Sequence, residues 1–154
     1  MITDKPYAEI RRRLAYAPDK VFAAFADADL VARWLTPSPA IRLTVLQFDF
    51  QEGGSYRFAY HVPDAATVIV GGSYSVIKPP SKIVFSWIIE PPDEHAGIDS
   101  EVRVTITPSG TGSELLIRHE KFGREDAIER HATGWLGAVE QLTELLAEQG
   151  QGGH

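Results

Sequence analysis

The sequence predicts an α+β fold in which a curved antiparallel sheet of about seven strands wraps around a long C-terminal helix, with two short helices after the first strand. The first observation behind this prediction is the segment Glu125–Glu148, which contains two glycines and no proline. Its apolar residues recur at steps of three and four, which places them on one face of a helix about 36 Å long. These residues are Ile128, Trp135, Val139, Leu142 and Leu146. Because a long helix must cover an apolar surface, we expect it to lie across the concave face of a sheet and to leave a hollow there.

The second observation is the alternation of apolar and polar residues at every other position through the middle of the chain, which is typical of strands. Strands are expected at Tyr7–Tyr16, Ile41–Phe50, Ser55–His61, Val68–Ile77, Ile83–Ile89, Val102–Ile106 and Leu115–His119. Gly53 and Gly54 supply the positive φ angles that a tight hairpin turn requires. Gly71 and Gly72 lie inside a strand and predict a sharp bend there, as a curved sheet needs.

Two short helices are expected between the first two strands, over Asp19–Phe25 and Ala28–Leu35. Pro18 suits the first turn of the first helix, where its missing N–H would have no partner in any case. Each helix has an apolar side, and both sides are expected to face the same way. The segment Thr36-Pro37-Ser38-Pro39 ends helical structure, because a residue before proline is driven toward extended geometry.

Length and composition predict one domain over residues 1–148, followed by a disordered tail over residues 149–154. The chain has 154 residues, of which 44% are hydrophobic and 10% aromatic. A domain of this size buries a substantial core without disulfides or metals. The absence of cysteine excludes thiol nucleophiles and thiolate metal sites, and it fits a reducing compartment.

Several classes of partner are excluded by charge and patterning. The net charge of −6 disfavours nucleic acid, since a nucleic-acid reader needs a basic stripe. The five histidines lie far apart in sequence, so no metal site and no cofactor is expected. No apolar run is long enough to span a bilayer, and the first six residues lack the apolar core of a signal peptide. We therefore expect a cytoplasmic protein without a membrane span.

Short motifs in a fixed order give the chain a resemblance to a known family. They are Ala17-Pro18 with Val21-Phe22, Asp29 with Trp34, Asp49 with Gly53-Gly54-Ser55-Tyr56, Gly72-Ser73-Tyr74, Pro79-Pro80 with Ile83-Val84-Phe85-Ser86-Trp87, Ser100 with Val102, and His131 with Gly134-Trp135. With these motifs the chain resembles the bacterial relatives of the activator of heat-shock protein 90 ATPase. That family lies within the START, polyketide-cyclase and birch-pollen-allergen-like (SRPBCC) superfamily. The resemblance covers nearly the whole chain and implies a helix-grip fold, in which the long helix sits in the concave face of the sheet.

The predicted concave face is aromatic and carries almost no charge, which is the usual composition of a ligand pocket. Side chains from the strands and helices are candidates to line this cavity. The candidates are Trp34, Phe58, Tyr60, Tyr74, Phe85, Trp87, His131 and Trp135. Trp87 and Trp135 are also typical core residues, because an indole buries a large area. His131 lies one helical turn before Trp135, where a lone histidine most often bonds to nearby backbone. For Trp34, a place at the cavity mouth and a place in the core remain open.

The sequence also predicts a cross-strand ion pair and a solvated polar loop. Asp49 and Arg57 lie on hairpin-related strands and are expected to form a cross-strand ion pair of about 0–1 kcal/mol. The proline-rich loop carries Glu90, Asp93, Glu94 and His95. Flexible polar loops are mostly solvated, so we expect these side chains to face water.

Three hypotheses of function follow. The preferred one is a binding protein for a small apolar or aromatic molecule held in an internal cavity. The second, implied by the resemblance, is a chaperone-associated interaction module. The third is a cyclase or hydrolase that acts on a hydrophobic substrate in the cavity. No serine lies in a recognisable catalytic context, so no catalytic residue is assigned and enzymatic activity is not the preferred reading. Such a domain is expected to be a monomer or a homodimer.

Overall fold

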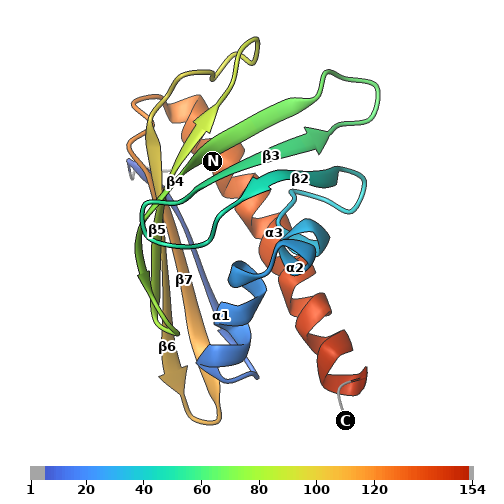
Figure 1. The fold of residues 1–154 in the computed structure, drawn as a ribbon, viewed down its shortest axis with the longest axis vertical. Coiled ribbons are helices and arrows are strands. Elements are labelled where there is room, and N and C mark those ends of the chain that lie inside the picture. Colours follow the sequence, from blue (N-terminus) through green and yellow to red (C-terminus); the bar gives the residue numbers. More distant parts are fainter. Residues whose placement is uncertain (1–5, 153–154) are drawn as a thin grey trace.

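A computed structural model describes residues 6–152 as a seven-stranded antiparallel sheet with three helices on one side (Figure 1). The strands are β1 Tyr7–Leu14, β2 Arg42–Phe48, β3 Ser55–His61, β4 Val68–Lys78, β5 Lys82–Ile89, β6 Ser100–Ser109 and β7 Gly112–Glu120, and the helices are α1 Pro18–Ala26, α2 Ala28–Trp34 and α3 Glu125–Gly152. The order of the strands across the sheet is β1-β7-β6-β5-β4-β3-β2. This architecture confirms the predicted helix-grip fold.

The long helix α3 presents to the sheet the face that the periodicity predicted. Ile128, Trp135, Val139, Leu142 and Leu146 are all buried. Trp135, Val139, Leu142 and Leu146 pack with inward-facing side chains of β6 and β7 in the main core, whereas Ile128 belongs to a smaller cluster with Ala8 and Phe122. A polar contact also joins the helix to the edge strand β1, because Arg12 donates to Glu140 at 2.6 Å. The apolar stripe therefore explains why α3 lies on the sheet.

The helix extends further than the sequence predicted. α3 continues to Gly152, so the helix includes residues 149–152 of the expected tail. Residues 153–154, the rest of that tail, lie outside the described residues, as do residues 1–5 at the other end of the chain. Glycine disfavours helix only by about 1 kcal/mol, which does not end a helix that has already been propagated over many turns.

The two short helices fill one end of the concave face. Asp27 ends α1 and caps α2, where its carboxylate accepts hydrogen bonds from the N–H groups of Asp29 and Leu30 at 2.8 and 3.2 Å. The indole of Trp34 donates to the carbonyl of Ala24 at 2.9 Å and packs edge-on against Phe25. These contacts fix α1 and α2 to each other as a unit beneath the sheet.

The sheet bends at the two predicted glycine pairs and at a β-bulge that follows the second pair. Gly53 has a φ of 86° in the hairpin turn between β2 and β3. A β-carbon on Gly72 would overlap the carbonyl of Ser86 in the neighbouring strand, so only glycine lets β4 and β5 approach so closely here. The register of β4 against β5 shifts between Tyr74 and Val76, which is a β-bulge. Bulges increase local twist and bend the strand, as a wrapped sheet requires.

Gly134 and Gly137 of α3 face the segment that follows α2. A β-carbon on Gly137 would overlap the carbonyl oxygen of Pro37, whereas one on Gly134 would lie 3.8 Å from the Pro37 side chain, an ordinary contact. The side chain of Gln141 donates to the carbonyl of Thr36 at 2.6 Å. The segment at Thr36 and Pro37 is therefore held tightly against the middle of α3.

This close approach yields a matched pair of variants. Gly137→Ala should lower the free energy of unfolding by about 2 kcal/mol, because the helix or the Pro37 segment must shift to admit the new methyl group. Gly134→Ala should leave stability unchanged or raise it by up to about 1 kcal/mol, since alanine favours helix and has room. Urea denaturation of the two variants measures the difference. Equal effects would show that the Pro37 segment does not pack against Gly137 as described.

Candidate ligand-binding site

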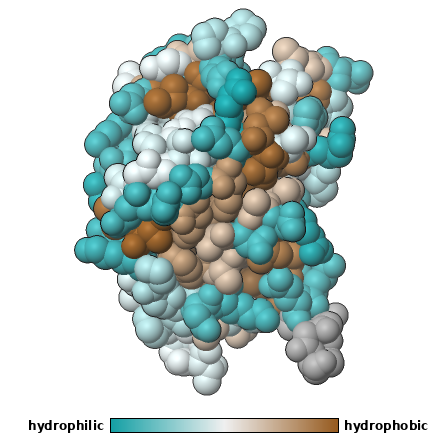
Figure 2. Space-filling view, in the orientation of Figure 1, coloured by the Kyte–Doolittle hydropathy of each residue, from teal (hydrophilic) through white to brown (hydrophobic). Residues whose placement is uncertain are grey.

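A cavity of about 250 Å³ lies between α3 and the strands β3, β4 and β5. Its walls are mostly apolar. The lining residues are Leu35, Thr36, Pro37, Ile41, Tyr60, Val62, Val68, Val70, Trp87, Ile89, Arg130, His131, Thr133, Gly134, Trp135 and Ala138. On the face of the molecule drawn in Figure 2, hydrophobic residues gather in a band down the middle, between hydrophilic margins.

Four of the eight candidate residues from the sequence lie together in this wall. They are Tyr60 of β3, Trp87 of β5, and His131 and Trp135 of α3. The Tyr60 hydroxyl donates to the carbonyl of Leu35 at 3.0 Å, which ties β3 to the end of α2. Burial raises the pKa of Tyr60 above its ordinary value, so this hydroxyl is protonated at neutral pH.

The other four candidates do not line the cavity, because α1 and α2 occupy that end of the concave face. Phe58, Tyr74 and Phe85 belong to a continuous cluster of aromatic rings around Tyr56, whose ring centroid lies 4.6 Å from that of Phe58. The cluster extends through Phe50 to Phe22 of α1. Trp34 is fully buried at the junction of α1 and α2, so of its two open readings the structure places it in the core.

Two hydrogen bonds between indole and imidazole rings join the sheet to α3. The indole N–H of Trp87 donates to Nε2 of His131 at 3.2 Å, and the indole N–H of Trp135 donates to Nδ1 of His119 at 2.9 Å. An indole N–H only donates, so each of these imidazole nitrogens must lack a proton. His119 lies on β7 and accepts the hydrogen bond of the cavity-wall residue Trp135. It was not among the candidates predicted from the sequence.

The remaining ring nitrogens fix the tautomers. Nδ1 of His131 lies 2.8 Å from the carbonyl of Ala127 and therefore carries the proton. Nε2 of His119 lies 2.8 Å from the hydroxyl of Ser100, whose own proton goes to the carbonyl of Trp87 at 2.6 Å, so this Nε2 is the donor. Both histidines are neutral in this arrangement. The expected backbone hydrogen bond of His131 is present.

The Ser100 and His119 pair does not have the geometry of a nucleophile and its base. A catalytic histidine accepts the serine proton, and a third group orients its other nitrogen by accepting a hydrogen bond. Here the histidine donates to the serine, and its other nitrogen accepts from Trp135. Both side chains are also fully buried. This pair is accordingly part of the support beneath the cavity wall.

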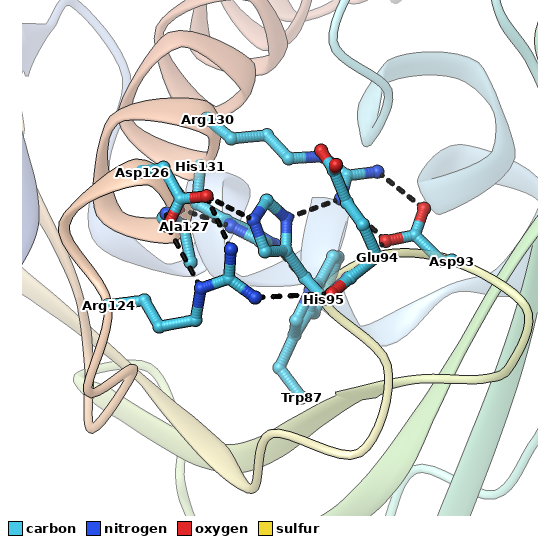
Figure 3. A network of polar contacts seen from close by, with 9 residues as sticks. All are labelled: Trp87, Asp93, Glu94, His95, Arg124, Asp126, Ala127, Arg130 and His131. Atoms are coloured by element: carbon cyan, nitrogen blue, oxygen red, sulfur yellow. Dashed lines mark hydrogen bonds and ion pairs between the residues drawn. The ribbon is translucent and has the colours of Figure 1, made fainter.

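A polar network joins the proline-rich loop after β5 to the start of α3 (Figure 3). The expectation that its side chains face water is wrong for His95, which is buried, whereas Glu94 is exposed as expected. Asp93 accepts two hydrogen bonds from Arg130, at 2.7 and 2.9 Å. His95 is only 3% exposed and lies between Arg130 and Asp126, with Nδ1 2.8 Å from the guanidinium and Nε2 3.1 Å from the carboxylate. The hydrogen bond from Arg130 lowers the pKa of Asp93 to about 2. Charge partners on α3, which are distant in sequence, immobilise this loop.

The expected ion pair between Asp49 and Arg57 is also wrong. Arg57 instead makes two 2.8 Å hydrogen bonds to Glu90, which directly follows β5 at the start of the proline-rich loop. The Asp49 carboxylate accepts from the side chain of Gln51 within the turn. In the register of β2 and β3, Arg57 lies opposite Gln47 and the N–H of Asp49 donates to Ser55, so Asp49 is not the cross-strand partner of Arg57.

Within residues 6–152, no three His, Asp or Glu side chains gather in a way that could hold a metal ion. No helix in that part of the chain is both long enough and apolar enough to cross a membrane.

The geometry defines a helix-grip domain with an apolar cavity that is partly open to solvent, and comparison with known proteins gives its family. A family model described as "Activator of Hsp90 ATPase homolog 1-like protein" matches residues 15–147. The chain belongs to this family, which confirms the resemblance seen in its motifs. No curated protein sequence matches the chain.

Solved structures share the fold over nearly the whole chain. A protein from Chromobacterium violaceum is 27% identical, with a TM-score of 0.80, and the match covers 92% of this chain and 96% of that one. An AHSA1 protein from Silicibacter pomeroyi is 23% identical, with a TM-score of 0.81, and the coverage is 93% and 99%. DynU16, a protein in the dynemicin biosynthetic locus, is 19% identical with a TM-score of 0.72, and the match covers 93% of this chain and 48% of that one.

The buried neutral histidines predict that stability depends on pH. Burial lowers the pKa of His131 to about 4 and, together with the proximity of His131, lowers the pKa of His119 well below its ordinary value. Between pH 6.5 and 4 the unfolded chain therefore binds more protons than the folded one, so the free energy of unfolding falls as the pH falls. The part due to His131 is about 3 kcal/mol. Urea denaturation at pH 7, 5.5 and 4.5 measures this loss.

Nitrogen chemical shifts provide the control for this pH dependence. NMR at pH 7 should show His131 as the tautomer with the proton on Nδ1 and His119 as the tautomer with the proton on Nε2. A stability that is flat from pH 7 to 4.5, or an imidazolium signal from either ring at pH 7, would contradict the described hydrogen bonds.

Proposed function

We propose that this protein binds a small apolar or aromatic molecule in the cavity between the sheet and α3. The observation that carries the proposal is a cavity of about 250 Å³ that has mostly apolar walls and is partly open to solvent. Apolar cavities of roughly 150 Å³ in a protein core bind benzene. The larger volume here leaves room for a molecule of one or two fused rings.

The state of the polar groups in the wall supports an apolar ligand. Each of the two indole N–H groups donates to a histidine, and the Tyr60 hydroxyl donates to Leu35. The hydroxyl of Thr36 donates to the carbonyl of Ile41 at 2.6 Å. Because the protein itself already uses these donors, a ligand gains affinity mainly by removing its apolar surface from water.

The family also supports this reading, since its members commonly bind hydrophobic ligands. The description of DynU16 as a protein in a biosynthetic locus is in line with a role among small molecules. Fold alone does not define function, so the cavity wall remains the basis of the proposal.

The two other hypotheses have less support from particular residues. A chaperone-associated module would present an exposed apolar patch. The large hydrophobic residues exposed in the described part of the chain are Leu46 on β2 and Leu136 on α3. A cyclase or hydrolase would need polar groups poised in the cavity, and the imidazole of His131 is occupied on both nitrogens.

A cavity-filling variant tests the proposal with naphthalene as the probe. Naphthalene should raise the melting temperature and change the tryptophan fluorescence of the protein, because Trp87 and Trp135 line the cavity. Ala138→Leu places a larger side chain in the wall and should weaken naphthalene binding at least tenfold while the protein stays folded. Thermal melts and fluorescence titration give both quantities.

Ala23→Leu is the matched control, because Ala23 is exposed on α1 and lies outside the cavity. This variant should bind naphthalene as the wild type does. The proposal fails if naphthalene gives no stabilisation of the wild type, or if both leucine variants bind it equally well.

A further inference from the structure

The mouth of the cavity holds unused hydrogen-bond donors on one arginine. Arg130 lines the cavity, and 36% of its side chain remains exposed. Its Nη1 bonds to Asp93 and to Nδ1 of His95, and its Nη2 bonds to Asp93. A guanidinium has five N–H donors, so the Nε–H and one Nη2–H have no partner among residues 6–152.

The charges around this arginine disfavour an anion. Asp93 and Glu94 act on Arg130 directly, and Asp126 lies on the far side of His95. Arg124 donates to Asp126 at 2.7 and 3.0 Å (Figure 3). Nδ1 of His95 accepts from Arg130, so its proton lies on Nε2 toward Asp126 and the ring adds no charge. Three carboxylates therefore surround two guanidinium groups, and the cluster as a whole is negative.

The depth of the cavity and its mouth thus offer different chemistry. In the depth, the N–H and O–H donors of Trp87, Trp135 and Tyr60 are used by the protein, so a carbonyl or carboxylate buried there would lack a partner. At the mouth, Arg130 has two free N–H groups within a negative surrounding. A neutral acceptor gains a charge-assisted hydrogen bond from Arg130, whereas a carboxylate also meets the repulsion of the cluster.

Building on the proposed function, we propose that the ligand is an uncharged ring compound with a neutral hydrogen-bond acceptor, such as a ketone, at one edge. Its rings fill the apolar depth, and its carbonyl oxygen accepts from Arg130 at the mouth. Arg130 is then a specificity residue, which selects neutral carbonyl compounds over both hydrocarbons and carboxylates of the same shape.

Three naphthalene derivatives of nearly equal shape test this selection: 2-ethylnaphthalene, 2-acetylnaphthalene and 2-naphthoate. Titration at pH 7, followed by tryptophan fluorescence and calorimetry, should show the ketone binding about fivefold more tightly than the hydrocarbon, from one exposed charge-assisted hydrogen bond. The carboxylate should bind at least tenfold more weakly than the ketone. This comparison uses the wild-type protein and needs no variant to fold.

Variants of two arginines in the same network assign the effect. Arg130→Met keeps a long side chain but removes the guanidinium, so the ratio of the ketone and hydrocarbon affinities should fall to about one. Arg124→Met removes a guanidinium from the same network at a position that does not line the cavity, and the fivefold ratio should persist. Circular dichroism establishes that both variants are folded.

The outcomes separate the two proposals. Equal affinities for ketone and hydrocarbon in the wild type, tightest binding of the carboxylate, or a ratio that survives in Arg130→Met would each overturn the role of Arg130 while binding in the cavity stands. If the wild type binds none of the three compounds, the proposed function falls together with this inference.

Discussion

The cavity depends on two directional hydrogen bonds between the sheet and α3. Trp87 and Trp135 each donate an indole N–H to an imidazole, His131 and His119 respectively. A hydrogen bond fixes a ring in orientation as well as in place, so these bulky side chains cannot rotate inward to fill the space between the layers. The pKa values of both histidines are lowered, which keeps the rings neutral at pH 7. Neutral rings are required here, because a proton on the accepting nitrogen would face the indole N–H.

Packing decides which part of the concave face stays hollow. Helices α1 and α2 bring Phe22, Phe25 and Trp34 against the aromatic cluster of β3, β4 and β5, and that end becomes solid core. After α2, the segment at Pro37 contacts α3 at Gly137. The chain then leaves the concave face and continues into β2. Past this point neither α1 nor α2 covers the strands, so the ends of β3 to β5 and the first half of α3 form the walls of the cavity. The position of the cavity therefore follows from where α2 ends.

Much of this fold could be predicted from periodicity, because the apolar stripe of α3 and the alternation of the strands are local patterns. The cavity wall was harder, since Tyr60 and Phe58 occupy the same strand face and differ only in whether α1 and α2 reach them. Spacing along α3 could have added Ala138, which lies on the same helical face as His131 and Trp135. The polar loop was misjudged because the partner of Asp93 is Arg130, 37 residues away, and no local pattern connects them.

The central claim is that an unfilled apolar space exists beneath α3. Crystals of the protein exposed to xenon test it most directly, because xenon enters dry apolar cavities of this size. The account predicts a xenon atom enclosed by Tyr60, Trp87 and Trp135, with the two indole to imidazole hydrogen bonds intact. Crystals that show no xenon there, with these side chains in contact across the space, would contradict it.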